Sequence, residues 1–291
     1  MASLPADPPL LSVKSGRVKA ARRLARRASR ARSGLFLAEG PQAVREALRI
    51  PDCVVEVFAV PEAGDSEPRL RDLAAAQDIP WRPVDDAALA SLTETVHPQG
   101  VVAVCRTLDR PLPDVLPMPS DQRGIVAVCA DVRDPGNAGT VIRCADAAGA
   151  TAVVLTGRSV DPYNGKAVRA SAGSVFHLGL AIEPDTAAVV GLLRRRGFQV
   201  LAADGAGETD LDDAIDEGFL ARPTAWLFGN EAWGLPDDLA DLADRRVRIP
   251  IHGRAESLNL ATAAAVCLYA SARAQRSDPG ESSVATGGST V

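Results

Sequence analysis

The chain has 291 residues, 46% of them hydrophobic and 24% charged, which suffices for one large or two modest folded domains and excludes disorder of the whole chain. Lysine and arginine number 32 against 37 aspartates and glutamates, a formal net charge of −5. The uncharged stretch at residues 257–272 contains Ser, Asn and Thr and falls short of the roughly 20 apolar residues of a membrane span. It predicts a buried helix and no membrane partner.

Cysteine and histidine patterns give no sign of disulfides or a metal centre. The five cysteines are scattered and lack a CxxC pair, which is typical of reduced thiols in a reducing compartment. None of the three histidines has a second His or Cys at metal-ligand spacing, so no metal is expected. The chain opens without the pattern of a secretory signal, and we expect a cytoplasmic protein.

Positive charge is concentrated near the start of the chain. Residues 11–34 contain nine basic side chains and no acidic one. On a helix, arginines four positions apart form one stripe, which can follow a phosphate backbone. A solvated helix face and an organellar transit peptide remain alternatives. The arginines expected to contact nucleic acid are Arg22, Arg23, Arg26, Arg27 and Arg30.

A first α/β unit is expected over residues 14–107, after a proline-rich stretch at 1–13 that is expected to be disordered. Behind the basic helix, the pattern predicts helices at 43–48 and near 70–77 and strands at 54–60 and 100–105. Residues 108–122 contain four prolines and no helical period, which is typical of a semi-rigid linker. The domain boundary is therefore placed there.

A second unit is expected over residues 123–274, where strands alternate with helices. Such alternation indicates an α/β domain with a mostly parallel sheet, covered on both faces and binding ligands beyond the carboxyl ends of its strands. The tail at 275–291 is expected to be disordered. The predicted strands are 125–130, 152–155, 175–182, 198–202, 224–228 and 247–251, and the predicted helices are 138–148, 166–172, 186–196 and 258–272.

The first of three loops with chemical character follows the strand at 125–130 and reads DVRDPGNAGTVIR over residues 131–143. Its Pro and Gly residues set a tight turn, and Asn137 is placed to cap the next helix or to bond across the turn. Arg143 projects a guanidinium from inside that helix. The loop matches neither G-x-G-x-x-G nor the phosphate-binding GxxxxGK[ST] pattern, which argues against NAD and ATP.

The second loop, LFGNEAWGLP at residues 227–236, follows another buried strand. Gly229 permits close approach of a backbone to a ligand, while Asn230 and Glu231 place an amide and a carboxylate just past the strand. Trp233 could stack on a base, although a lone Trp more often packs in a core.

The third loop, IPIHGRAESLNL at residues 249–260, leads into an alanine-rich final helix, for which Ser257 is the expected N-cap. Its exposed backbone groups could hold the edge of an adenine.

Taken in this order, the segments DVRDPGNAGTVIRCADAAGA, LFGNEAWGL and IPIHGRAESLNLATAAAVCLY resemble the three motifs of the SpoU (TrmH-type) branch of the SPOUT RNA methyltransferases. The resemblance covers about residues 124–273. The basic helix together with GLFLAEGPQAVREAL is similar to the N-terminal RNA-substrate-binding domain that is often fused to these enzymes.

The resemblance implies a C-terminal α/β domain whose backbone is threaded into a trefoil knot, with a smaller N-terminal α/β RNA-binding domain. It implies S-adenosyl-L-methionine as the cofactor, RNA as the substrate and a homodimer as the assembly. The cofactor-binding residues implied by the resemblance are Gly229, Ile249, Leu258, Thr156, Gly157, Asn230 and Ile251.

The resemblance also assigns the catalytic roles. Arg143 matches the arginine credited with activating the ribose 2′-hydroxyl, supported by Asn137, Glu231, Ser257 and Asn259. A guanidinium does not readily give up its proton, so we expect Arg143 to position the hydroxyl and stabilise the developing alkoxide, with a substrate phosphate as a potential proton acceptor.

The expected activity is methylation of a ribose 2′-hydroxyl in structured RNA, with large-subunit ribosomal RNA favoured by the separate basic domain. A transfer RNA substrate and a non-catalytic RNA-binding or ribosome-assembly role are the alternatives. Whether the protein serves housekeeping or antibiotic resistance stays open.

Overall fold

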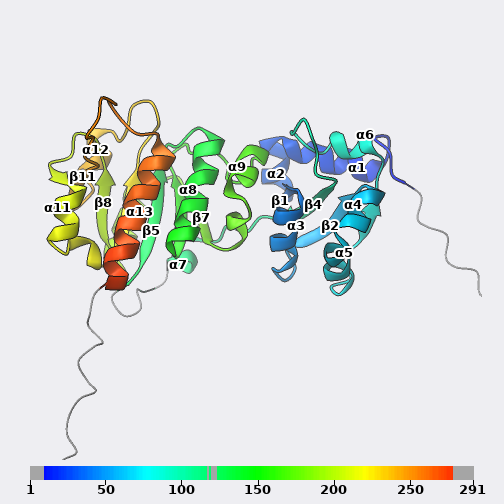
Figure 1. Ribbon diagram of the computed structural model, residues 1–291, viewed down its shortest axis with the longest axis horizontal. Coiled ribbons are helices and arrows are strands. Elements are labelled where there is room, and N and C mark those ends of the chain that lie inside the picture. The colour runs from blue at the N-terminus through cyan, green and yellow to red at the C-terminus, as the bar shows by residue number, and fades with distance from the viewer. Residues whose placement is uncertain (1–9, 117, 119–122, 278–291) are drawn as a thin grey trace, which may run out of the picture.

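A computed structural model describes residues 10–116, 118 and 123–277 (Figure 1). Two α/β domains lie side by side, the N-terminal one in blue and cyan, the second running from green to red. The predicted α/β class with a mostly parallel sheet is confirmed. Within the described residues, no helix combines the length and the apolar character needed to cross a bilayer.

The N-terminal domain is built on a four-stranded sheet in the order β1-β4-β2-β3. Only β2 and β3 are parallel; β4 pairs antiparallel with both β1 and β2. Its helices cover both faces of this sheet, α3 and α5 on one and α1, α4 and α6 on the other. Its elements are α1 (Gly16–Arg22), a 3-10 turn (Arg23–Ala25), α2 (Arg27–Ser33), β1 (Leu35–Glu39), α3 (Pro41–Leu48), β2 (Val54–Ala59), α4 (Pro61–Ser66), α5 (Pro68–Ala75), β3 (Trp81–Pro83), α6 (Asp86–Ala90) and β4 (Val101–Arg106).

The basic segment is not the single helix that its periodicity predicts. The 3-10 turn interrupts it, and Arg26 between the turn and α2 is extended, with φ −94° and ψ 129°. This break lets Val18 and Leu24 both enter the core beneath the sheet. The arginines therefore do not form one stripe, and tertiary packing has overridden the helical period.

The second domain has a seven-stranded sheet in the order β7-β6-β5-β10-β8-β11-β9, and every strand pair in it is parallel. Helices α8, α9, α11 and α13 cover one face and α7, α10 and α12 the other. Its elements are α7 (Leu112–Val115), β5 (Ile125–Ala130), α8 (Pro135–Ala148), β6 (Ala152–Thr156), α9 (Gly165–Ser171), a 3-10 turn (Ser174–Phe176), β7 (Gly179–Glu183), α10 (Thr186–Arg195), β8 (Gln199–Ala203), β9 (Thr209–Asp210), α11 (Leu211–Asp216), a 3-10 turn (Phe219–Ala221), β10 (Thr224–Phe228), α12 (Asp237–Ala240), β11 (Arg245–Arg248) and α13 (Leu260–Ser277).

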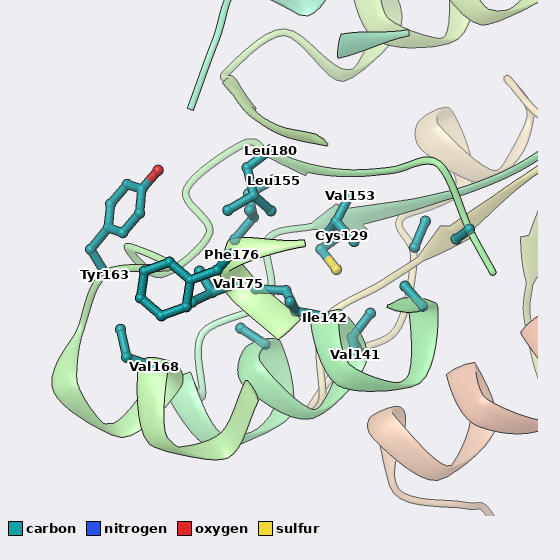
Figure 2. Close-up of a cluster of buried hydrophobic side chains, with 14 of the residues drawn as sticks. Cys129, Val141, Ile142, Val153, Leu155, Tyr163, Val168, Val175, Phe176 and Leu180 are labelled. Atoms are coloured by element: carbon teal, nitrogen blue, oxygen red, sulfur yellow. The ribbon is translucent and has the colours of Figure 1, made fainter. Parts of the chain in front are cut away.

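The central strands β5, β6 and β10 are buried on both faces, and for this reason their sequences are continuous apolar runs. Figure 2 shows part of the core beneath them, where Val141 and Ile142 of α8 pack with Cys129, Val153 and neighbouring side chains of the sheet. This core fixes α8 against the strands and thereby positions the loop that precedes it.

The two domains share a buried junction. The ring of Phe36 in β1 packs 4.6 Å from that of Tyr163 and 6.0 Å from that of Phe176, centroid to centroid. The Tyr163 hydroxyl accepts the backbone N–H groups of Leu108 and Asp109 at 2.7 and 2.6 Å, which ties down the segment between the domains. The junction is therefore packed and hydrogen-bonded.

Part of the predicted linker belongs to the second domain. Residues 112–115 form α7, and Leu112, Val115 and Leu116 are buried beneath the sheet. A proline in the first turn of a helix is well tolerated, so the prolines here did not exclude helix. Residues 117 and 119–122 lie outside the described residues.

Several predicted boundaries shift. Within the stretch predicted to be a disordered N-terminus, Leu11 bridges to Val84, while residues 1–9 lie outside the described residues. Helix α13 begins later and runs further than predicted, to Ser277, and residues 278–291 of the predicted tail are also not described. The strand predicted at 175–182 is a 3-10 turn followed by β7, and the one predicted at 247–251 ends at Arg248, because Pro250 cannot continue the ladder.

Candidate functional site

The three motif loops meet at the carboxyl edge of the second sheet. The Glu231 carboxylate, just past β10, accepts the backbone N–H groups of Arg133 and Asp134 at 3.2 and 3.1 Å. It also accepts the Asn137 side-chain amide at 3.2 Å. Glu231 therefore joins the second loop to the first.

Asn259 joins the third loop to the same network. Its Nδ2 donates to Oδ1 of Asn137 at 3.1 Å. Its Oδ1 accepts the N–H groups of Ala261 and Thr262 at 2.9 and 3.4 Å, so Asn259 caps α13. The prediction that Ser257 is this cap is wrong, because the helix begins at Leu260, three residues after it.

Arg143 stands apart from this network. It lies on α8 six residues after Asn137, about 240° further around the helix axis. Its side chain is exposed, and among the described residues it forms no ion pair and no side-chain hydrogen bond. The guanidinium is therefore available to a ligand or to another chain.

The start of α8 is fixed by a residue that the sequence analysis did not single out. Asp134 is its N-cap, accepting the Asn137 N–H at 2.9 Å, and it pairs with Lys166 of α9 at 2.8 Å. The hydrogen bond from Lys166 lowers the pKa of Asp134, assisted by the backbone N–H of Asn137 and opposed by partial burial. Asp followed by Pro is a common start to a helix and could have revealed this cap.

The second loop closes on itself beneath the site. Asn230 and Gly234 exchange two backbone hydrogen bonds of 2.9 Å, which brings the Gly229 backbone so close to Gly234 that a Cβ at position 229 would lie 2.4 Å from a carbonyl carbon. The Asn230 side chain is 6% exposed, and its Nδ2 donates to the Asp131 carbonyl at 2.7 Å. Asn230 thus holds the first loop, and Gly229 is required by the backbone itself.

Thr156 ends β6 beside the first loop, and Gly157 follows it. The buried Thr156 hydroxyl bonds the Thr186 hydroxyl at 2.8 Å, and Gly157 has a positive φ of 63°. A Cβ on Gly157 would meet the Asp131 carboxylate at 2.9 Å, so this glycine allows the two loops to approach closely.

The third loop is open. All of residues 251–259 are exposed, including Ser257, while Ile249 just before them packs against the core. Ile251 and Leu258 are 38% and 37% exposed, and Trp233 of the second loop is 58% exposed. Apolar surface therefore lies beside the amide and carboxylate groups of the site.

Backbone N–H groups hold the Glu231 carboxylate and the Asn259 amide, and these two side chains hold the Asn137 amide between them. Burial raises the pKa of the Cys129 thiol in β5 to about 12, reinforced by the nearby Glu231 charge, so this thiol stays protonated. In the described part of the chain, no group of three or more His, Cys, Asp or Glu is placed to hold a metal ion.

Comparisons with known proteins agree with this arrangement. Residues 124–269 match the model of the SpoU rRNA Methylase family, and residues 16–103 match the MRM3-like substrate binding domain. The chain is 33% identical over 264 residues to the 23S rRNA (guanosine(2553)-2'-O)-methyltransferase RlmP of Bacillus subtilis (strain 168), covering 89% of this chain and 96% of that one.

The chain is also similar to solved structures of SpoU and rRNA methyltransferases. The SpoU methyltransferase AviRb from Streptomyces viridochromogenes, in complex with the cofactor AdoMet, has a TM-score of 0.79 and 30% identity, over 91% of this chain and 99% of that one. The AdoMet-bound rRNA methyltransferase from Sinorhizobium meliloti has a TM-score of 0.79 and 32% identity, over 91% of this chain and 98% of that one. The chain belongs to the SpoU rRNA Methylase family.

Proposed function

We propose that the protein transfers a methyl group from S-adenosyl-L-methionine to a ribose 2′-hydroxyl of large-subunit ribosomal RNA. Its relatives include 23S rRNA 2′-O-methyltransferases, and it carries a domain that matches a substrate-binding model in front of the methylase domain. The observation that carries the proposal is the chain of contacts from Asn259 through Asn137 to Glu231, which joins all three motif loops at one sheet edge.

The site fits this cofactor. S-adenosylmethionine has no phosphate and supplies an electrophilic methyl group when bound. The open loop at 251–259 offers backbone donors and acceptors for an adenine edge, and Ile251 and Leu258 offer apolar surface beside them. We assign cofactor contacts to these residues and to Gly229, Ile249 and Asn230, with Thr156 and Gly157 bordering the site.

Arg143 is assigned to the substrate hydroxyl. A guanidinium keeps its proton at physiological pH, so it stabilises the developing negative charge and positions the oxygen, while a substrate phosphate accepts the proton. Asn137, Glu231 and Asn259 hold the loops that frame the reaction, and Ser257 is assigned to the open loop as a substrate contact.

The basic segment is assigned to RNA with one change. Arg22, Arg23, Arg26 and Arg27 are exposed and suited to phosphate contacts. Arg30 is 4% exposed and its guanidinium contacts Asp161, so it does not serve as a surface contact. The RNA-binding role is kept for the other four.

A homodimer through the outer face of α13 is part of the proposal. Val266 and Tyr269, one turn apart on that face, are 38% and 52% exposed, and α13 packs beside α8, which carries Arg143. Exposed apolar groups on a helix beside a site favour an interface with a second copy. Light scattering during size exclusion tests this: wild type is expected as a dimer and Tyr269→Glu as a monomer. The trefoil knot and a cytoplasmic location stay predictions.

A transfer RNA substrate is the second candidate, because a tRNA (guanosine(18)-2'-O)-methyltransferase of Thermus thermophilus is 34% identical over 154 residues. That match covers 52% of this chain. The test is to incubate the protein with methyl-labelled S-adenosylmethionine and either unmodified 23S rRNA or unmodified tRNA. Label in the rRNA alone supports the proposal; label in the tRNA alone replaces it; label in neither, with cofactor bound, favours the non-catalytic alternative.

A further inference from the structure

A groove of about 310 Å³ lies at the junction of the two domains. Three segments meet there: α2, the chain that leaves β4, and the sheet edge at β6 and β7. Its volume is at the lower end of the range of small-ligand sites. The groove is lined in part by Arg27, Ala31, Thr107, Asp109, Val160 and Ile182.

Arg27 brings a positive charge to the groove. Arg27 is exposed, and among the residues the structure describes it forms no ion pair and no side-chain hydrogen bond. It belongs to the segment 11–34, which has nine basic residues and no acidic one. The groove therefore lies where the most basic stretch of the chain meets the methylase domain.

Apolar side chains also line the groove. Ile182 is 46% exposed on β7, the edge strand of the seven-stranded sheet, and Val160 beside it is partly buried. The Asp109 carboxylate, also exposed, offers acceptors for base N–H groups. A guanidinium, an aliphatic surface and a carboxylate acceptor in one groove match the phosphate and the base of one nucleotide.

The two domains are fixed to each other beside the groove. Arg30, one turn after Arg27, contacts the Asp161 carboxylate through Nε at 2.8 Å and Nη2 at 2.7 Å. Its Nη1 donates to the carbonyls of Leu24 and Ala25 at 2.8 and 2.9 Å. This buried arginine fastens α2 to the β6–α9 connection, so the groove does not depend on a flexible linker.

The groove lies on the same sheet edge as the methylation site. Strand pairing aligns Ile182 with Leu155 of β6 and, through it, with Cys129 of β5, two residues before Asp131 opens the first loop. Two strand spacings amount to about 10 Å.

We propose that this domain-junction groove binds a single unpaired nucleotide that flanks the methylated ribose in the RNA substrate, with its phosphate on Arg27 and its base against Ile182. Single-stranded RNA is recognised by phosphate contacts combined with packing of splayed bases. The inference rests on the proposed function and adds a place where the flanking sequence is held.

The test uses the full-length protein and an unmodified 23S rRNA transcript. Arg27→Ala and Ile182→Glu are each expected to raise the KM for RNA about fivefold to tenfold, with the KM for S-adenosylmethionine and kcat within twofold of wild type. Arg27→Ala is also expected to reduce the slope of log binding constant against log salt concentration by about one. Arg27→Lys, which keeps the charge, is expected to recover most of the affinity.

Two matched controls separate the groove from general charge effects. Arg71→Ala removes an exposed arginine from α5, and Val96→Glu adds the same negative charge at a residue that is 89% exposed. Both are expected to leave RNA binding within twofold of wild type. Thermal unfolding of every variant identifies any loss that comes from misfolding, and Arg27→Lys remains informative if Ile182→Glu fails to fold.

The outcomes distinguish the two proposals. If wild type methylates the RNA and the groove variants behave as the controls do, the groove assignment is overturned and the proposed function stands. If wild type binds the transcript and the groove variants weaken that binding without any methylation by wild type, the groove assignment stands and the proposed activity fails.

Discussion

Arg30 and Asp161 form a buried ion pair across the domain junction, with side chains 4% and 12% exposed and a shortest contact of 2.7 Å. The pair joins the basic segment of one domain to the β6–α9 connection of the other. An arginine that the sequence assigns to RNA is thus a structural link between the domains.

Breaking this pair is expected to destabilise the protein strongly. Asp161→Ala leaves the buried Arg30 guanidinium without its charge partner, which costs about 3 kcal/mol in the free energy of unfolding. The matched control is Glu217→Ala, which breaks only the exposed pair between Glu217 and Arg245 and is expected to cost less, about 1 kcal/mol or below. Calorimetric unfolding of both variants checks this, and equal losses in the two would contradict it.

His177 makes the junction sensitive to pH. Burial by itself lowers the pKa of His177, but hydrogen bonds to Asp146 and Glu46, at 2.8 and 3.3 Å, outweigh burial and raise it above its usual value. A raised folded-state pKa gives stability that is fully present below the unfolded value near 6.5 and is lost as the pH rises through the folded value.

The protein is therefore expected to lose a small part of its stability between about pH 6 and pH 8, and His177→Gln is expected to lose less over that interval. The partly exposed pair limits the effect to about 1 kcal/mol or less. Thermal midpoints measured at half-unit pH steps give the comparison. An identical pH dependence in the variant would rule out this role for His177.

Asn259 has two separable functions. Asn259→Asp keeps the oxygen that caps α13 and loses the Nδ2 donor to Asn137, so stability is expected to stay near wild type while activity falls. Asn259→Ala loses both and is expected to cost about 1 kcal/mol of stability in addition. Unfolding midpoints and methyl-transfer rates for the two variants test this. Full activity in Asn259→Asp would show that the hydrogen bond to Asn137 is not needed for activity.

The link between Glu231 and Asn137 is expected to matter for rate more than for cofactor affinity. Asn137→Ala removes the contacts to both Glu231 and Asn259 and is expected to lower kcat/KM for RNA about 10²-fold, because small displacements of reacting groups have effects of that size. Glu231→Gln alters the same link and is also expected to lower the rate. Glu62→Gln, on the exposed surface of α4, is the matched control and is expected to leave the rate unchanged. Near-normal rates in both site variants would show that the network is only structural.

The sequence predicted those parts of the fold that local pattern determines. The strands β5 and β10 have the predicted bounds because continuous apolar runs between turn signals leave little freedom. The motif loops meet as expected since parallel strands end at one edge of a sheet.

Long-range contacts could not be predicted in this way. The burial of Arg30 depends on Asp161, 131 positions later, and the break at Arg26 depends on how Leu24 packs. Ser257 and Asn259 are both good caps by residue type, and only the structure shows that Asn259 caps α13 and also contacts Asn137. The predicted roles of Arg143, Ser257 and the cofactor contacts stay predictions.

Locating the transferred methyl group tests the proposed 2′-O-methyltransferase activity most directly. RNA labelled by the wild-type protein is digested to nucleosides, alongside RNA treated with Arg143→Ala and with Arg195→Ala, an exposed arginine on α10. We expect a 2′-O-methylated nucleoside with wild type and Arg195→Ala, and about 10²-fold to 10³-fold slower formation with Arg143→Ala. Label on a base, or an Arg143→Ala variant as fast as wild type, would contradict it.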